Sequence, residues 1–202
     1  MPGQFLRVTV RDPMNSLVRT VLLLASLVAA GALQAKEQEE SIFLFQNRKV
    51  SIVVPDGLGF ASSKDERGLM IVQIADPKDK VSMAMTFLPD PTGTYANARS
   101  RKELMDESFR QYVEGSVEKT MQFEELEPKM GVGTYCVFTD ASLAGKTKLP
   151  PHEYLNSTTG VKSWPGVVVV FSLFSNGTAS KEYKAVMKML RESVHENPVP
   201  LR

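Results

Sequence analysis

The sequence predicts an α+β domain in which an antiparallel β-sheet is flanked by helices. Three observations lead to this fold class. Short strand-like segments follow one another in runs instead of alternating one by one with helices, and two segments repeat apolar residues at helical spacing. Turn-forming residues separate neighbouring strand segments, which favours hairpins and therefore antiparallel pairing.

The first run of strands covers residues 42–45, 50–54, 69–75 and 81–88. Pro55-Asp-Gly57 ends the second of these segments, and Asp76-Pro-Lys-Asp-Lys80 has the composition of a hairpin turn. In the last segment the larger apolar residues fall on alternate positions and therefore share one face of the strand. They are Val81, Met83, Met85 and Phe87.

A helix is predicted to follow, beginning at Ser100. Ser100 and Glu103 have the spacing of a capping box, in which both side chains satisfy free backbone donors. Apolar residues at steps of three and four then form one stripe, which we expect to pack on the sheet. The stripe consists of Leu104, Met105, Phe109, Tyr112, Val113, Val117 and Met121.

The second run of strands covers residues 121–127, 131–139, 154–161 and 167–174. A long polar loop begins after Asp140 and reaches Pro150-Pro151, and Trp164-Pro-Gly166 forms a turn between the last two strands. A closing helix is predicted from about Ser180 to Asn197-Pro198, because proline cannot continue a helix. Its predicted buried residues are Tyr183, Val186, Met187, Leu190 and Val194, and it would carry His195.

This layout resembles the PsbP fold, named after an extrinsic protein of photosystem II. The resemblance is carried by "FQNRKVSIVVPDGL", the helix of residues 100–121, "GVGTYCVFTDAS" and the last helix, over most of residues 42–195. A Ran-binding nuclear-import factor and bacterial periplasmic proteins of unknown role share that fold. The resemblance implies a sandwich that serves as an assembly or binding module, and it supplies no site residue. A cystatin-like sheet wrapped on a helix is the alternative fold.

The N-terminus has the pattern of a secretory signal peptide. An apolar run at residues 21–30 follows Arg19 and precedes small residues, and it is too short to span a membrane, which takes about 20 residues. Cleavage after Ala32 or Ala35 would fit, and Met14 fits the pattern as a start better than Met1. We therefore expect residues 1–35 to be a signal peptide, residues 36–202 to form one domain without an integral membrane segment, and the protein to be exported, to a bacterial periplasm or outside the cell.

Charge and cysteine content limit the function classes. Removing three arginines and one aspartate with the first 35 residues leaves 21 basic and 22 acidic side chains, which gives no electrostatic reason to expect a nucleic-acid partner. Cys136 is the only cysteine, so an internal disulfide is excluded. The sequence leaves the oligomeric state open.

Two motif fragments occur in the loop after Asp140. Gly145-Lys146-Thr147 resembles the end of a phosphate-binding loop, but the required upstream glycine is replaced by Asp140 and prolines follow where a helix should begin. His152-Glu153 resembles half of a zinc-protease motif whose second histidine is replaced by Asn156. We therefore predict no cofactor and no metal site.

Two hypotheses for function remain. The first is a non-catalytic binding or assembly module for a protein or cell-envelope partner, with Phe60, Tyr154 and Trp164 as candidate surface anchors, although each could equally belong to the core. The alternative is a cysteine-dependent hydrolase or redox accessory in which Cys136 works with His152. No catalytic residue is assigned, because no catalytic constellation is present in the sequence, and Cys136 alternates with apolar neighbours as a buried strand residue does.

Overall fold

The computed structural model describes residues 37–196, and these residues form two antiparallel sheets and two α-helices. The larger sheet has seven strands in the order β3-β4-β5-β9-β8-β7-β6, and the smaller has the order β1-β2-β10. The strands of the larger sheet are β3 (Gly59–Lys64), β4 (Met70–Ala75), β5 (Val81–Asp90), β6 (Glu124–Glu125), β7 (Val132–Thr139), β8 (Asn156–Trp164) and β9 (Gly166–Ser175). Those of the smaller sheet are β1 (Gln38–Phe43), β2 (Lys49–Val54) and β10 (Val194–Glu196).

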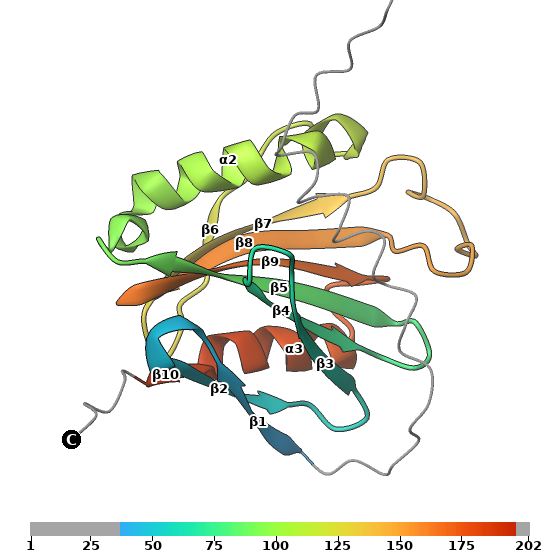
Figure 1. Ribbon diagram of the computed structural model, residues 1–202. Coiled ribbons are helices and arrows are strands. Elements are labelled where there is room, and N and C mark those ends of the chain that lie inside the picture. Colours follow the sequence, from blue (N-terminus) through green and yellow to red (C-terminus); the bar gives the residue numbers. More distant parts are fainter. Residues whose placement is uncertain (1–36, 197–202) are drawn as a thin grey trace, which may run out of the picture.

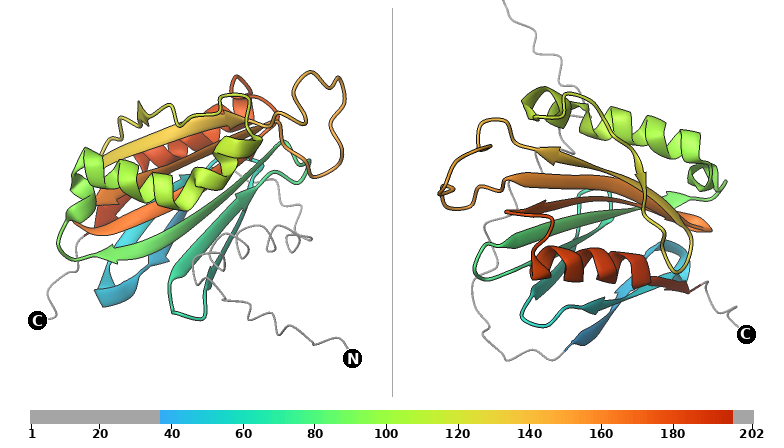
Figure 2. Two further views of the ribbon diagram at one scale, coloured as in Figure 1. Left: turned by 90° about the horizontal axis from the view of Figure 1, so that it is seen from above. Right: turned by 180° about the vertical axis from the view of Figure 1, so that it is seen from behind.

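The elements are arranged in three layers (Figure 1). Helix α2 (Ala98–Gly115) covers one face of the seven-stranded sheet over β7 and β8. Helix α3 (Lys181–Glu192) lies on the opposite face together with the small sheet, as the views from above and behind show (Figure 2). The predicted α+β class with a helix-flanked antiparallel sheet is therefore confirmed. The predicted signal peptide lies outside the described residues.

Alternation along the strands divides the interior into two cores. On β5, the predicted apolar face of Val81, Met83, Met85 and Phe87 is buried towards α3 and the small sheet. On the other side of the sheet, Cys136, Phe138 and the apolar stripe of α2 form a second core. Because successive side chains of a strand point to opposite faces, one sheet supplies both cores.

The start of α2 differs from the prediction. Asn97, and not Ser100, is the N-cap residue, and its Oδ1 accepts a hydrogen bond of 2.8 Å from the backbone N–H of Arg99. The turn Thr94–Ala96 places Asn97 in the extended conformation that an N-cap requires, so the helix begins before Ser100. The Thr94–Ala96 turn and the Asn97 cap together determine where the helix starts, and both lie before the predicted capping box.

Both helices also end earlier than predicted. Helix α2 stops at Gly115, because the chain then becomes extended and Ser116 bridges Asp140 of the sheet; Val117 is 54% exposed. Helix α3 stops at Glu192 and the chain turns into β10, which pairs with β2. His195 therefore lies on a strand and not on the last helix, and its side chain is buried.

Strand β3 was not predicted. Its sequence, Gly59-Phe-Ala-Ser-Ser-Lys64, has little of the β-branched and aromatic character of a central strand. It lies at the edge of the seven-stranded sheet, where only one side pairs with a neighbour, so the pairing with β4 determines its conformation.

Two buried basic side chains connect the helices to the sheet. Lys162 on β8 is 0% exposed, and its Nζ donates to the carbonyl oxygens of Leu190 (2.7 Å) and Ser193 (3.1 Å) at the end of α3. Burial lowers the pKa of Lys162 to about 7. On the other face, Arg101 of α2 donates from Nε to Oγ1 of Thr134 on β7 and from Nη1 to the carbonyl of Ala96. Each cation donates to backbone oxygens beside one end of a helix and thereby connects that end to the sheet.

Candidate functional site

A pocket of about 160 Å³ opens where the C-terminal end of α2 meets the sheet and the root of the β7–β8 loop. In Figure 1 these elements converge at the end of α2 that lies beside the loop of residues 140–155. The pocket is lined by residues from α2, β7, β8, β9 and the loop, so it requires the folded sheet and cannot be recognised from any one segment.

Three residues in register across the sheet form its floor. Phe138 of β7 is paired with Ser157 of β8, which is paired with Phe174 of β9. Cross-strand partners point to the same face, so Ser157 stands between two phenylalanine rings on the side that α2 covers.

Two tyrosines form the walls. The Tyr112 ring of α2 lies 6.1 Å from the Phe138 ring and 6.5 Å from the Phe174 ring, between ring centroids. The Tyr154 ring of the loop lies 6.0 Å from Phe174 on the other side. The pocket is therefore lined by four neighbouring aromatic rings.

Polar groups in the pocket are few. Asp140, at its rim, accepts hydrogen bonds of 2.7 Å from the backbone N–H and the hydroxyl of Ser142. The hydrogen bond from the Ser142 side chain is the main reason that the pKa of Asp140 is lowered, so the carboxylate is ionised at neutral pH. The hydroxyl of Ser157 is buried and has no hydrogen-bond partner among residues 37–196.

The predicted anchors have different positions. Tyr154 lines the pocket and is half-buried. Phe60 lies on β3 and packs, partly buried, against the core beneath α3. Trp164 is only 3% exposed, because β8 directs it into the same core, so it is a core residue and not a surface anchor. The three residues therefore do not form one surface.

Cys136 and His152 have none of the features of a catalytic pair. Cys136 is fully buried in the core under α2, and burial, followed by the charge of Glu124, raises the pKa of its thiol to about 12. A nucleophilic cysteine requires the opposite shift. His152 is on the outer loop with 79% of its side chain exposed, and its Nδ1 lies 2.9 Å from Oδ2 of Asp79.

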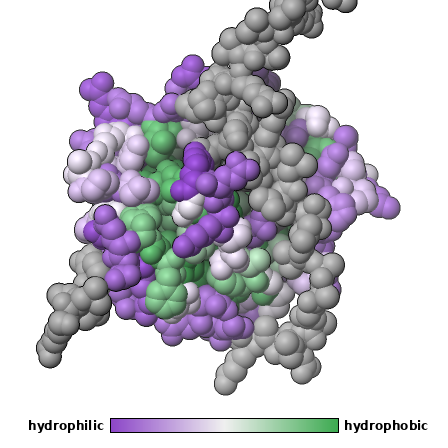
Figure 3. Space-filling view, in the orientation of Figure 1, coloured by the Kyte–Doolittle hydropathy of each residue, from purple (hydrophilic) through white to green (hydrophobic). Residues whose placement is uncertain are grey.

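Other features of the described residues give no second site. Within residues 37–196, no group of three or more His, Cys, Asp and Glu side chains is arranged to hold a metal ion, and no helix is long and apolar enough to cross a membrane. Figure 3 shows hydrophobic residues in small groups surrounded by hydrophilic ones on the face seen in Figure 1. The most exposed large apolar side chain is Phe43 of β1, at 67%, and isolated exposures of this kind are ordinary on protein surfaces.

The residues that line the pocket fall in predicted elements, but the sequence could not show that they lie together. Phe138, Ser157 and Phe174 lie in three separate predicted strands, and their meeting depends on strand order and register. Comparison of the chain with models of protein families, with curated proteins and with solved structures found no match, so the site is interpreted from its own geometry.

Proposed function

We propose that the chain is an exported, non-catalytic binding or assembly module whose pocket receives a side chain of a protein or cell-envelope partner. The observation that carries the proposal is the cluster of four aromatic rings around the Ser157 floor, beside an exposed loop. Aromatic rings held in fixed orientation bind apolar groups with little loss of side-chain entropy, and they dominate the energetics of many interfaces.

The size of the pocket supports a single side chain as the occupant. A cavity of about 150 Å³ can hold a benzene-sized molecule, and this pocket is of that scale. The residues around it favour binding over catalysis, because Asp140 is the only carboxylate that lines it and no nucleophile–base pair accompanies it. The similarity of the element order to the PsbP fold, which often serves as an assembly module, agrees with this proposal.

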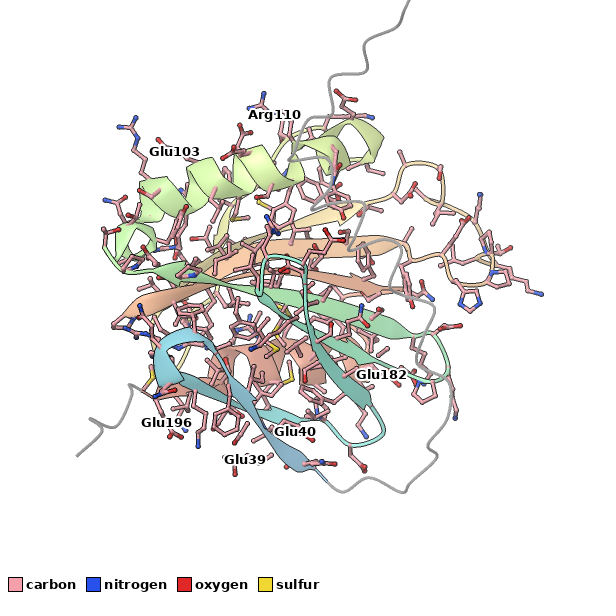
Figure 4. The ribbon with its side chains drawn as sticks, viewed as in Figure 1. Glu39, Glu40, Glu103, Arg110, Glu182 and Glu196 are labelled. Atoms are coloured by element: carbon pink, nitrogen blue, oxygen red, sulfur yellow. The ribbon has the colours of Figure 1, made fainter. Side chains whose placement is uncertain are left out.

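A photo-crosslinking experiment tests the site. Benzoylphenylalanine is introduced at Gln111, which is exposed at the pocket, and at Glu103 as the matched control. Figure 4 shows Glu103 on the side of α2 that points away from the sheet. The helical rise of 1.5 Å per residue places it about 12 Å along the helix from Gln111. We expect a defined adduct in the cell envelope from position 111 and none from position 103.

A pocket-filling variant makes this test specific. Ser157→Phe would occupy the space between Phe138 and Phe174 with a third ring, so the adduct at position 111 should disappear. Its circular dichroism spectrum and unfolding midpoint serve as the check that the fold is retained. An adduct that persists in a folded Ser157→Phe protein, or equal adducts at both positions, would refute a partner at this pocket.

Export is tested separately. Residues 1–35 are fused to a reporter that is active only outside the cytoplasm, and a fusion without residues 21–30 is the control. We expect activity only with the apolar run present, and mass spectrometry of the processed product distinguishes cleavage after Ala32 from cleavage after Ala35. An inactive, unprocessed fusion would contradict export.

A further inference from the structure

We propose that the pocket selects a lysine side chain of the partner, binding its methylene stem against the aromatic lining and its ammonium group at Asp140. This inference rests on the proposed function and names the chemistry of the side chain that enters. It uses two features of the pocket: the sign of the charges around it and its aromatic lining.

The charges at the pocket are negative. Asp140 is the only charged residue that lines it among the described residues. Burial, then the carboxylates of Asp79 and Asp76, raise the pKa of the Tyr154 hydroxyl, which places two further negative charges within electrostatic reach of that wall. The neighbouring cations belong to the exposed loop: Lys146 acts on Asp140, and His152 contacts Asp79. A carboxylate or phosphate ligand would thus meet Asp140 without a compensating cation in the pocket lining.

The aromatic rings suit a cation better than a neutral group of the same shape. The face of an aromatic ring is the negative end of its quadrupole and attracts an ammonium group within about 6 Å of its centroid. Tyr112, Phe138, Tyr154 and Phe174 all lie within one pocket of about 160 Å³, so an ammonium group in it is close to several rings at once. The methylene stem of a lysine buries apolar surface against the same rings.

The test is a titration of the mature chain, residues 36–202, with blocked amino acids followed by NMR. The probes are N-acetyl-lysine methylamide and its norleucine counterpart of similar shape without charge. We expect saturable shifts of the amide signals of Gly115, Ser157 and their neighbours, with lysine bound about tenfold more tightly than norleucine. Phosphoethanolamine is added as a third probe, because a lipid headgroup carries the same ammonium chemistry.

One conservative variant tests the role of the charge. Asp140→Asn keeps an oxygen that accepts from Ser142 but removes the charge, so the affinity for the lysine probe should fall about tenfold while that for norleucine is unchanged. Glu103→Gln, which removes an exposed carboxylate of α2, is the control and should change neither affinity.

The outcomes separate the two proposals. Equal affinities for lysine and norleucine would overturn the charge selection and leave an apolar binding pocket intact. Tighter binding of phosphoethanolamine than of lysine would overturn the protein source of the ammonium group. Absence of saturable shifts at the pocket with every probe would overturn both the lysine inference and the pocket as a binding site.

Discussion

Replacing Lys162 by methionine tests whether the buried amine makes stability depend on pH. Lys162 lies fully inside the domain, with Nζ 4.5 Å from the centre of the Trp164 ring and within 2.8 Å of Oγ of Ser193. Its burial lowers the pKa to about 7, compared with 10.5 for a free lysine. Methionine keeps an unbranched apolar stem in the same space and cannot take up a proton.

The direction of the pH effect follows from these two pKa values. Between pH 7 and pH 10.5 the unfolded chain holds more protons at this site than the folded chain, so the free energy of unfolding rises with pH. The rise is at most about 1.4 kcal/mol per pH unit. From pH 7.0 to pH 8.5 it amounts to about 1.5 kcal/mol, because the folded site is still partly protonated at the lower pH.

The hydrogen bonds of Lys162 affect mainly the difference in the free energy of unfolding between the native protein and Lys162→Met at any one pH. Removing the amine takes a donor from the carbonyl of Ser193, at a cost of about 1–3 kcal/mol. The carbonyl of Leu190 retains the Ser193 hydroxyl as a donor, and that of Arg191 retains the backbone N–H of Lys129. The difference in slope with pH therefore reports the titration of Lys162, and the difference at one pH reports the lost contact.

Urea unfolding at pH 7.0, 7.5, 8.0 and 8.5 provides the measurement, with the fluorescence of Trp164, the only tryptophan, as the probe. The free energy of unfolding should show this rise with pH in the native protein, and the rise should be absent from the Lys162→Met variant. Lys188→Met on the exposed side of α3 is the control and should follow the native slope. Equal slopes in the native protein and Lys162→Met would refute the reasoning, and would mean that the carbonyl oxygens and the Trp164 ring stabilise the ammonium as strongly as burial disfavours it.

Three further predictions concern the caps, the packing and the thiol. Asn97→Ala should lower the free energy of unfolding by about 1 kcal/mol in urea titrations because it removes the N-cap of α2, whereas Ser100→Ala should be nearly neutral; the reverse order would restore Ser100 as the cap. Gly160→Ala should cost about 1–3 kcal/mol or more, since its Cβ would lie 2.5 Å from the Phe171 ring and 2.6 Å from the Thr134 carbonyl oxygen. Gly177→Ala, where no atom lies within 4 Å, is the matched control, and equal melting temperatures for the two variants would contradict the packing. Cys136 should react with a maleimide only after unfolding in urea, and a fast reaction in the native protein would revive the cysteine-dependent alternative.

Most of the fold was predictable because its signals are local. Strand-sized segments bounded by turn residues identified β2, β4, β5, β7, β8 and β9, and the apolar stripes identified both helices. The start of α3 near Ser180 was also predicted from sequence, and the structure shows Ser180 as its N-cap, with Oγ accepting from the backbone N–H of Tyr183. These patterns depend on neighbours within about four residues, which is the range that a sequence displays directly.

The errors occurred where distant contacts override local preference. Val194 continues the apolar spacing of α3, but β2 offers an unpaired edge at that point and the chain pairs with it as β10. Strand β3 has weak strand propensity and forms against β4. The sequence could not show whether Trp164 is exposed or buried. Its burial depends on which face of the sheet α3 and the small sheet cover.

The sequence by itself determined most of the elements, among them the two amphipathic helices, and the antiparallel class, because period and turn chemistry are properties of short segments. Only the tertiary structure decided which side chains of each strand face α2 and which face α3 and the small sheet. Strand order brought Phe138, Ser157 and Phe174 into one row and created the aromatic pocket. The same packing placed the amine of Lys162 at the end of α3, since burial and long-range pairing depend on residues far apart in the chain.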